Sequence, residues 1–164
     1  MRKLKYLLEL IASPSRLLYA LRIWWLRRKG ITISNKADIR FPLYYRHPEN
    51  IVLDNAVIGE RTLLVAGSHS LLYIAENSLL APNVHINCTA HIYEDRKTPI
   101  AKQGGKERSI HISPDCWIGT GVVILANVGR GCVIGANSVI TKNTDDYEVM
   151  AGNPARHIMY RGGL

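Results

Sequence analysis

The chain has few of the residues that mark several common protein classes. Its three cysteines (Cys88, Cys116 and Cys132) are an odd number without Cys-x-x-Cys spacing, which argues against a disulfide framework and predicts reduced thiols in the cytosol. No apolar run approaches the ~20 residues that span a bilayer. No small-residue cleavage site follows the first short apolar run, so a signal peptide is not expected either.

Acidic residues are nearly missing from the start of the chain. Residues 1–30 hold eight bases and one acid, and the other residues hold 13 bases and 12 acids, out of a net charge of +8. The basic character therefore belongs to the N-terminal segment and not to the body of the protein, so nucleic-acid binding is not expected. A length of 164 residues with 47% apolar residues predicts one domain with an ample core.

The N-terminal segment reads as helical. We expect a short helix over residues 2–12 and a second that begins at Ser13-Pro14, runs to about Lys29 and is ended by Gly30. Its apolar residues include Trp24 and Trp25, beside several bases. Two interpretations stay open: the helix packs on the protein or a neighbouring subunit, or it contacts anionic lipid at a membrane surface.

From Ile31 onward the apolar residues recur with a period of six. A period of six fits neither an α-helix nor an isolated strand, whose periods are about 3.6 and 2. It is typical of a coil of three short strands, one hexapeptide per side, with one aliphatic residue per side on the axis. The expected axial residues are Ile33, Ile39, Val52, Ile58, Leu64, Ile74, Leu80, Ile86, Ile92, Ile112, Ile118, Ile124, Ile134 and Ile140.

Three segments depart from this period. Residues 93–109 are polar with a Gly-Gly pair, and we expect them to form a loop extruded from the coil, because long loops in a compact domain are usually functional. Two residues are missing near 128–131, which predicts a coil tightened at one corner. Residues 143–164 are expected to cap the open end of the coil, which would otherwise expose unpaired strands.

Four motifs together carry a resemblance to a known family. They are Cys116-Trp117-Ile118-Gly119, the run from Val133 to Lys142, Gly152-Asn153-Pro154-Ala155-Arg156, and Ala81-Pro82-Asn83-Val84-His85-Ile86 with the stretch ending at His91. Over roughly residues 50–158 the chain resembles the hexapeptide-repeat acyltransferases with a left-handed parallel β-helix, above all the maltose, galactoside and polysaccharide O-acetyltransferases. The resemblance implies a mainly β fold, with a helical segment 1–30 before an acyltransferase domain 31–164.

The resemblance also implies a function. Members of this kind transfer an acetyl group from acetyl-CoA to a carbohydrate hydroxyl without a metal, act as homotrimers, and have their sites in the clefts between subunits. We therefore expect a cytoplasmic enzyme of surface polysaccharide or glycolipid synthesis. Whether residues 1–29 also make a peripheral contact with the inner face of a bacterial membrane stays open.

Specific residues are assigned by alignment to the family motifs. His91 falls on the general base, and histidine suits that role because its pKa lies near neutrality. The segment around Trp117 and Thr120 falls beside the pantetheine arm and thioester, with a backbone N–H near Thr120 as oxyanion donor. The remaining coenzyme contacts implied are Ala136, Thr141, Lys142 and Arg156. His69, Glu94 and Asp95 are weaker candidates for the acceptor pocket.

Four alternatives remain open. The first is N-acetylation of an amino sugar. The second is a metal enzyme similar to γ-class carbonic anhydrases, in which His91 and His111 would be ligands. The third is a covalent route through Cys88, three residues before His91. The fourth is a non-catalytic hexapeptide scaffold, which would not need His91, Lys142 and Arg156 together.

Overall fold

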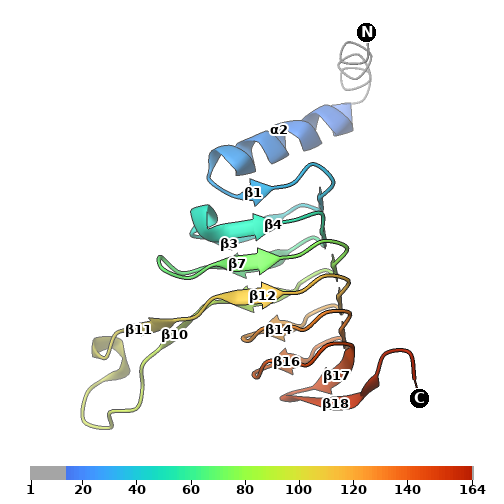
Figure 1. The fold of residues 1–164 in the computed structure, drawn as a ribbon. Helices are drawn as coiled ribbons and strands as arrows, with labels where there is room; N and C mark the ends of the chain where they lie inside the picture. The colour runs from blue at the N-terminus through green and yellow to red at the C-terminus, as the bar shows by residue number, and fades with distance from the viewer. Residues whose placement is uncertain (1–13, 164) are drawn as a thin grey trace.

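The computed structural model describes residues 14–163 and shows a parallel β-helix (Figure 1). Short strands wind around three sides, so each side is a sheet whose neighbouring strands come from successive coils. Sheet A contains β1 (Thr32–Ile33), β4 (Ile51–Leu53), β7 (Leu72–Ile74) and β12 (Ile110–Ile112). Sheet B contains β2 (Asp38–Ile39), β5 (Val57–Ile58), β8 (Leu79–Leu80), β13 (Trp117–Ile118), β15 (Val133–Ile134), β17 (Glu148–Gly152) and β18 (Ala155–Tyr160). Sheet C contains β3 (Leu43–Arg46), β6 (Thr62–Val65), β9 (His85–Asn87), β14 (Val123–Ile124) and β16 (Val139–Ile140).

The core runs along the axis of the coil. Each side of each coil turns one aliphatic side chain inward, where it stacks on its partner in the next coil; Ile118, for example, pairs with Leu80 and Ile134. These axial side chains are almost completely buried, and the stacking removes a continuous apolar column from water. The predicted fold class is confirmed: the parallel β-helix expected from the six-residue period, and the left-handed form with an N-terminal helical segment that the resemblance implies.

Two expected axial residues are wrong. Leu53 is fully buried on the axis where Val52 was expected, and Val52 faces outward, half-buried, in the middle of β4. Ile92 lies in the extruded segment, half-buried, and the axial place above Ile74 is taken by Ile112. At Val52 a neighbouring aliphatic residue offers the same local pattern, and the pairing between coils decides which one turns inward. At Ile92 the chain has already left the coil, because the extruded segment begins at Thr89.

The tightened coil is confirmed, but the short step lies between Ile124 and Val128, just before the predicted residues 128–131. Axial Ile124 is followed by axial Val128, and Ile112 pairs with Val128 through an isolated bridge only, so sheet A ends there. Gly129 fits close to the coil above, because a Cβ at this position would lie 2.5 Å from the carbonyl oxygen of Asp145. The missing residues therefore remove most of one strand and leave the axial stack intact.

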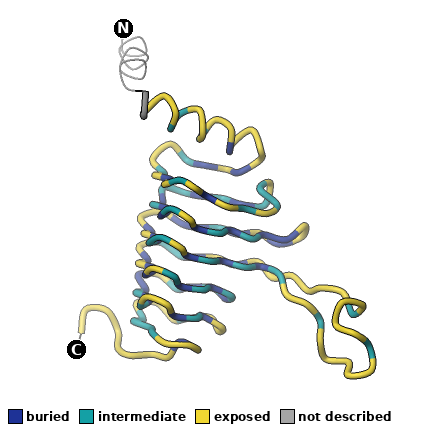
Figure 2. The backbone as a smooth tube through the Cα atoms, turned by 180° about the vertical axis from the view of Figure 1, so that it is seen from behind, coloured by how far each residue is buried: buried dark blue, intermediate teal, exposed yellow. Residues whose placement is uncertain are grey.

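The helix α2 (Pro14–Arg28) lies across the first coil and covers its open end (Figures 1 and 2). Leu26 is buried against that coil, and Arg27 donates to the carbonyl of Ile33 at 2.8 Å. The Tyr19 hydroxyl accepts the N–H of Ile39 at 3.2 Å. Gly30, with φ +114°, ends the helix as expected. The helix expected over residues 2–12 lies outside the described residues.

The extruded segment forms an arm that projects from the coil, and we call residues 89–109 the arm (Figure 1). Its outgoing strand β10 (Thr89–His91) and returning strand β11 (Gly105–Glu107) pair antiparallel, and the short helix η2 (Ile100–Lys102) lies between them. A second 3-10 turn, η1 (Pro48–Asn50), precedes β4. The predicted extruded segment is thus an ordered hairpin, and its outgoing strand begins at Thr89, before the expected start at residue 93.

The C-terminal end is a hairpin of β17 and β18. β17 continues the parallel ladder of sheet B through β15, and β18 folds back antiparallel. Arg161 then donates to the carboxylate of Asp115 at 2.8 Å and ties the hairpin to an earlier coil. Within residues 14–163, no helix has both the length and the apolar character needed to cross a membrane.

Candidate active site

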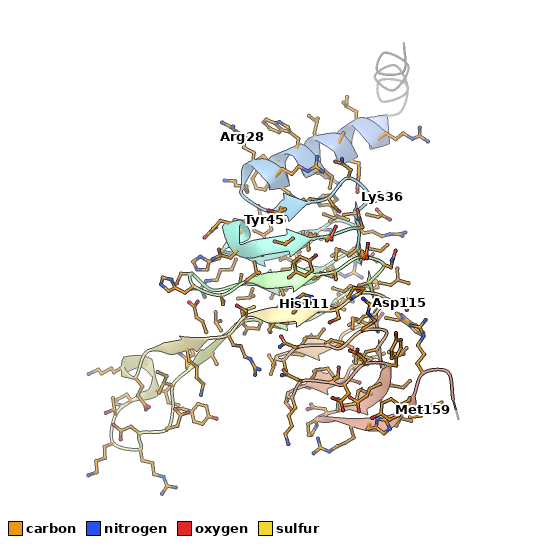
Figure 3. The ribbon with its side chains drawn as sticks, in the orientation of Figure 1. Arg28, Lys36, Tyr45, His111, Asp115 and Met159 are labelled. Carbon is orange, nitrogen blue, oxygen red and sulfur yellow. The ribbon has the colours of Figure 1, made fainter. Side chains whose placement is uncertain are left out.

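The candidate residues occupy two edges of the β-helix. We call the edge where the chain leaves sheet C for sheet A the CA edge, and the edge where it leaves sheet B for sheet C the BC edge. The third edge carries Asp115 and lies on the opposite side from the arm in Figure 3. Residues on one edge come from successive coils, so positions far apart in sequence lie above one another.

His91 lies on the CA edge. It is the last residue of β10, opposite Gly105 of β11, and its side chain is exposed at the root of the arm. The base of the arm is closed by the N–H of Arg108, which donates to the Cys88 carbonyl at 2.9 Å. Thr89 is fixed in turn by Asn87, whose Oδ1 accepts both its N–H and its hydroxyl at 2.9 Å. His91 therefore projects from a short, well-connected ribbon.

The carboxylates of Glu94 and Asp95 bind groups of the arm itself. Glu94 accepts from the Lys106 ammonium at 2.9 Å, and this bond holds the pKa of Glu94 down to about 2. Asp95 accepts the hydroxyl of Thr98 at 2.6 Å and the N–H of Lys97, and these bonds lower the pKa of Asp95. Both carboxylates are thus ionised near neutrality and shape the arm. Their predicted role in acceptor binding stays a prediction.

His69 lies in the neighbouring turn of the CA edge, residues 66–71, between β6 and β7. The structure brings this turn against the arm through Glu107, which sequence reasoning missed. Glu107 accepts the His69 N–H at 2.8 Å, and it accepts both the N–H and the hydroxyl of Ser68 at 3.1 Å. The bond from the His69 N–H contributes most to lowering the pKa of Glu107. The sequence offers no signal for this contact, because Glu107 is one of several charges in a polar segment.

Thr141 and Lys142 also lie on the CA edge, two coils beyond the arm. They follow β16 directly, and both side chains are exposed. The next residue, Asn143, accepts from the N–H of Asn127 at 3.1 Å and from Arg108 of the arm at 3.5 Å. The edge therefore presents His69, His91 and Lys142 from three levels of the same side.

Thr120 and Ala136 lie above one another on the BC edge. The Thr120 carbonyl accepts the N–H of Asn137 at 2.8 Å, which links the two corners. Gly119 permits this approach, because a Cβ there would lie 2.7 Å from the backbone nitrogen of Ala136. Both candidate residues are exposed.

Trp117 and Arg156 lie near the BC edge rather than the CA edge. Trp117 projects outward from sheet B between Leu79 and Val133, and 57% of it is exposed. Arg156 lies on β18 opposite Ala151, with its guanidinium bonded to the Ala155 carbonyl at 3.1 Å. One chain therefore does not bring the predicted coenzyme residues together, because Thr141 and Lys142 lie at the other edge of sheet C.

The cysteines point into the coil. Cys88, Cys116 and Cys132 are all buried free thiols, and burial raises the pKa of each, to about 11 for Cys116. A buried thiol with a raised pKa is a poor nucleophile, so the geometry gives no support to a covalent route through Cys88.

The second histidine of the metal alternative, His111, lies on the outer face of sheet A. Its ring stacks on Tyr73 with centroids 4.7 Å apart. Among residues 14–163, no three His, Cys, Asp or Glu side chains are grouped as a metal site would need.

Comparison with known proteins gives consistent matches. The protein-family model described as bacterial transferase hexapeptide (six repeats) matches residues 109–142. The galactoside O-acetyltransferase of Escherichia coli (strain K12) is 31% identical over 131 residues, which cover 77% of this chain and 62% of that protein. A putative colanic acid biosynthesis acetyltransferase of the same organism is 29% identical over 155 residues, covering 89% of this chain and 78% of that protein.

Solved structures agree with these matches. A galactoside acetyltransferase in complex with coenzyme A superposes with a TM-score of 0.67 at 30% identity, over 79% of this chain and 64% of that one. The chain thus spans less than two thirds of the galactoside O-acetyltransferases that it matches. The matches agree with the resemblance seen in the motifs: residues 109–142 match the hexapeptide repeat, and the chain is similar in sequence and fold to hexapeptide-repeat acetyltransferases.

Proposed function

We propose that the chain is an acetyl-CoA-dependent O-acetyltransferase that acts on a carbohydrate hydroxyl in the synthesis of a surface polysaccharide or glycolipid. The observation that carries this proposal is the position of His91: an exposed imidazole at the root of an ordered arm, on the same edge as Thr141 and Lys142. Two relatives, a galactoside O-acetyltransferase and a putative colanic acid biosynthesis acetyltransferase, support the reaction and the substrate class.

The proposed reaction is a direct transfer. His91 removes the proton of the acceptor hydroxyl while its oxygen attacks the thioester carbonyl. The oxyanion of the tetrahedral intermediate accepts a backbone N–H near Thr120, a preformed donor that costs no reorganisation. When the carbon–sulfur bond breaks, the imidazolium returns the proton to the leaving coenzyme A thiolate. A new ester and free coenzyme A result, and the enzyme is unchanged.

This mechanism needs two copies of the chain, because His91 and Thr120 lie on different edges of sheet C. A three-fold assembly with sheet C turned toward its axis would bring the CA edge of one subunit to the BC edge of the next. The outer face of sheet C supports this arrangement, since it carries a column of half-buried, mostly apolar side chains: Leu63, His85, Val123 and Val139. An extended apolar face of this kind is typical of an interface.

A matched pair of variants tests the trimer. Val123→Glu places a charge on the outer face of sheet C, and Val52→Glu places the same charge on the outer face of sheet A, where Thr32 and Tyr73 are its neighbours. Sedimentation should show a trimer for the wild type and for Val52→Glu, and smaller species for Val123→Glu. A monomeric wild type, or a trimeric Val123→Glu, would contradict the arrangement.

We also propose a peripheral contact of the N-terminal segment with the cytoplasmic face of a bacterial membrane. The helix α2 exposes Trp24 (60%) and Trp25 (48%) together with Leu17, Leu18 and Leu21. The helix contains no acidic residue, and the Lys29 ammonium lies over the Trp25 ring. A groove of about 520 Å³, lined mainly by apolar side chains of α2 and β3, opens beside it. Anionic lipid attracts each surface base by about 1 kcal/mol. The basic side chains and the exposed apolar side chains therefore both favour binding to an anionic membrane surface.

Point variants test the membrane contact better than deletion of residues 1–29, because Leu26 is part of the core. Trp24→Ser/Trp25→Ser should lose co-sedimentation with phosphatidylglycerol vesicles. Trp117→Ser, which removes an exposed Trp from the coil, should retain it. Neutral phosphatidylcholine vesicles should bind little of the wild type, and high salt should release much of it. Equal binding of all variants, or none by the wild type, would reject the contact.

One assay tests the proposed activity itself. The protein is incubated with acetyl-CoA and a panel of free, nucleotide-linked and lipid-linked sugars, and free thiol is measured. Thiol release that depends on a sugar hydroxyl, with an acetyl ester found on the product by mass spectrometry, is the expected outcome. An amide product would identify an N-acetyltransferase instead. No acceptor-dependent release across the panel would argue for a non-catalytic scaffold.

A further inference from the structure

Glu107 occupies an unusual place for an exposed charge. Its carboxylate, on the returning strand of the arm, binds the backbone of a different segment, residues 66–71. The three bonds that it accepts from Ser68 and His69 use both of its oxygens. Hydrogen bonds to an ionised acceptor are stronger than neutral ones, so this contact is the strongest link between the arm and the turn.

Neighbouring residues make the contact specific. Ser109 lies two residues further along the returning strand, and its hydroxyl accepts the N–H of Leu71 at 3.0 Å. Alternate residues of an extended segment face the same side, and Glu107 and Ser109 both face residues 66–71. On the other side of the turn, Asn50 donates to the Gly67 carbonyl at 2.8 Å. The turn is therefore held on one side by Asn50 of the preceding coil and on the other side by Glu107 and Ser109 of the arm.

Gly67 supplies the space for the carboxylate. A Cβ at this position would overlap the carboxylate atoms of Glu107. The φ of Gly67 is not in the left-handed region, so the absence of a side chain, and not backbone freedom, is what the site requires here. Glu107 and Gly67 thus form a matched pair across two segments.

The pairing within the arm connects this contact to His91. Glu107 lies opposite Thr89 in the ribbon, and His91 is two residues further along the same outgoing strand. We propose that Glu107 is a positioning residue: by anchoring the returning strand to Ser68 and His69, it fixes the root of the arm and holds the His91 imidazole in place. This inference rests on the proposed role of His91 as general base.

The contact of Glu107 with Ser68 and His69, which we call the anchor, depends on pH. It needs an ionised carboxylate, and the pKa of Glu107 is lowered, so the anchor is complete near neutrality and is lost only in acid, below the ordinary range of a glutamate. The anchor is therefore a fixed feature at physiological pH and not a pH switch. Its effect should appear in turnover and not in coenzyme binding, because the predicted phosphate contacts Lys142 and Arg156 lie elsewhere.

Hydrogen–deuterium exchange and kinetics on the full chain test the proposal together. In Glu107→Gln, amide exchange of residues 66–71 and 89–93 should accelerate roughly 10–100-fold, the range of a lost charged hydrogen bond. Turnover should fall by a similar factor, because a small misplacement of a catalytic group costs up to about 100-fold. The KM for acetyl-CoA should stay within about twofold, and Glu107→Asp should lie between the wild type and Glu107→Gln.

Gly67→Ala is the independent variant. Its added methyl group should displace the carboxylate of Glu107 while Glu107 itself is unchanged. It should reproduce the exchange and turnover of Glu107→Gln, and the double variant should be no worse than either single one, because both break one contact. Lys106→Gln is the matched control on the same strand. Its side chain bonds to Glu94, so exchange of residues 66–71 should not change.

The outcomes separate this proposal from the proposed function. Unchanged exchange in Glu107→Gln, or accelerated exchange with undiminished turnover, overturns the positioning role. If the wild type transfers no acetyl group, the proposed function fails. The exchange of residues 89–93 then still decides whether Glu107 fixes the strand that carries His91.

Discussion

The backbone N–H of Arg108 donates to the carbonyl of Cys88 at 2.9 Å, which joins the two ends of the arm. Below this bond the coil continues without a break, because Ile112 stacks directly on Ile74. The arm is therefore an insertion into a finished β-helix, and it brings the candidate base to the surface without interrupting the axial core.

This arrangement predicts that the arm can be removed. Replacing residues 89–107 by a short Gly-containing turn should leave a cooperatively unfolding β-helix, because the axial side chains make no use of the arm. Circular dichroism and thermal unfolding measure this. Turnover should fall at least about 100-fold with the loss of His91. A chain that no longer folds after the excision would show that the arm is part of the core structure.

The buried thiols give a second prediction. Burial raises the pKa of Cys116 to about 11, and its Sγ donates to the Ser113 and Gly129 carbonyls at 3.0 Å. Because the thiolate, and not the thiol, attacks alkylating and disulfide reagents, all three cysteines should react slowly in the folded protein at neutral pH and quickly in denaturant. Cys88→Ala should keep most of the activity. A fast-reacting native thiol whose modification abolishes turnover would favour a covalent route.

Much of the fold is predictable from the sequence, because each side of the coil must place one aliphatic side chain on the axis. The errors are local. Ile51, Val52 and Leu53 are all aliphatic, so composition does not decide which of them turn inward. Pairing with the next coil places Leu53 on the axis and turns Val52 outward. Ile92 has the right spacing, but the arm has already begun at Thr89.

The site is less predictable than the fold. The motifs single out the candidate positions, but they do not show that Lys142 and Thr120 lie on different edges of sheet C. Glu107 escapes sequence reasoning for a physical reason. Two of its three bonds come from backbone N–H groups of a turn in another coil, and a backbone donor leaves no residue type to recognise.

His85 predicts a pH dependence of stability. Its Nε2 is a buried side-chain nitrogen without a hydrogen-bond partner among the described residues, and burial lowers the pKa of this imidazole. The unfolded chain binds this proton near pH ~6.5 and the folded chain resists it, so the free energy of unfolding should fall as the pH drops through that value. Denaturant unfolding of the wild type and of His85→Leu, at matched protein concentration, measures this. An equally steep pH dependence in His85→Leu would contradict the assignment.

The predicted coenzyme contacts give a further test. Lys142→Ala and Arg156→Ala should each weaken coenzyme A binding through a lost phosphate contact. Binding of dephospho-coenzyme A, measured by calorimetry, distinguishes the phosphates. A residue that binds the 3′-phosphate loses its mutational effect with this analogue. If both variants are weakened equally for the two ligands, neither binds the 3′-phosphate.

The most direct test of the account is the turnover of His91→Ala in the acceptor-dependent thiol-release assay. The account predicts a fall of about 10²–10⁴-fold, the usual contribution of a general base, with coenzyme A binding little changed. His111→Ala, which removes an exposed imidazole stacked on Tyr73 of sheet A, is the matched control and should keep its turnover. A His91→Ala enzyme with near wild-type turnover would contradict the account.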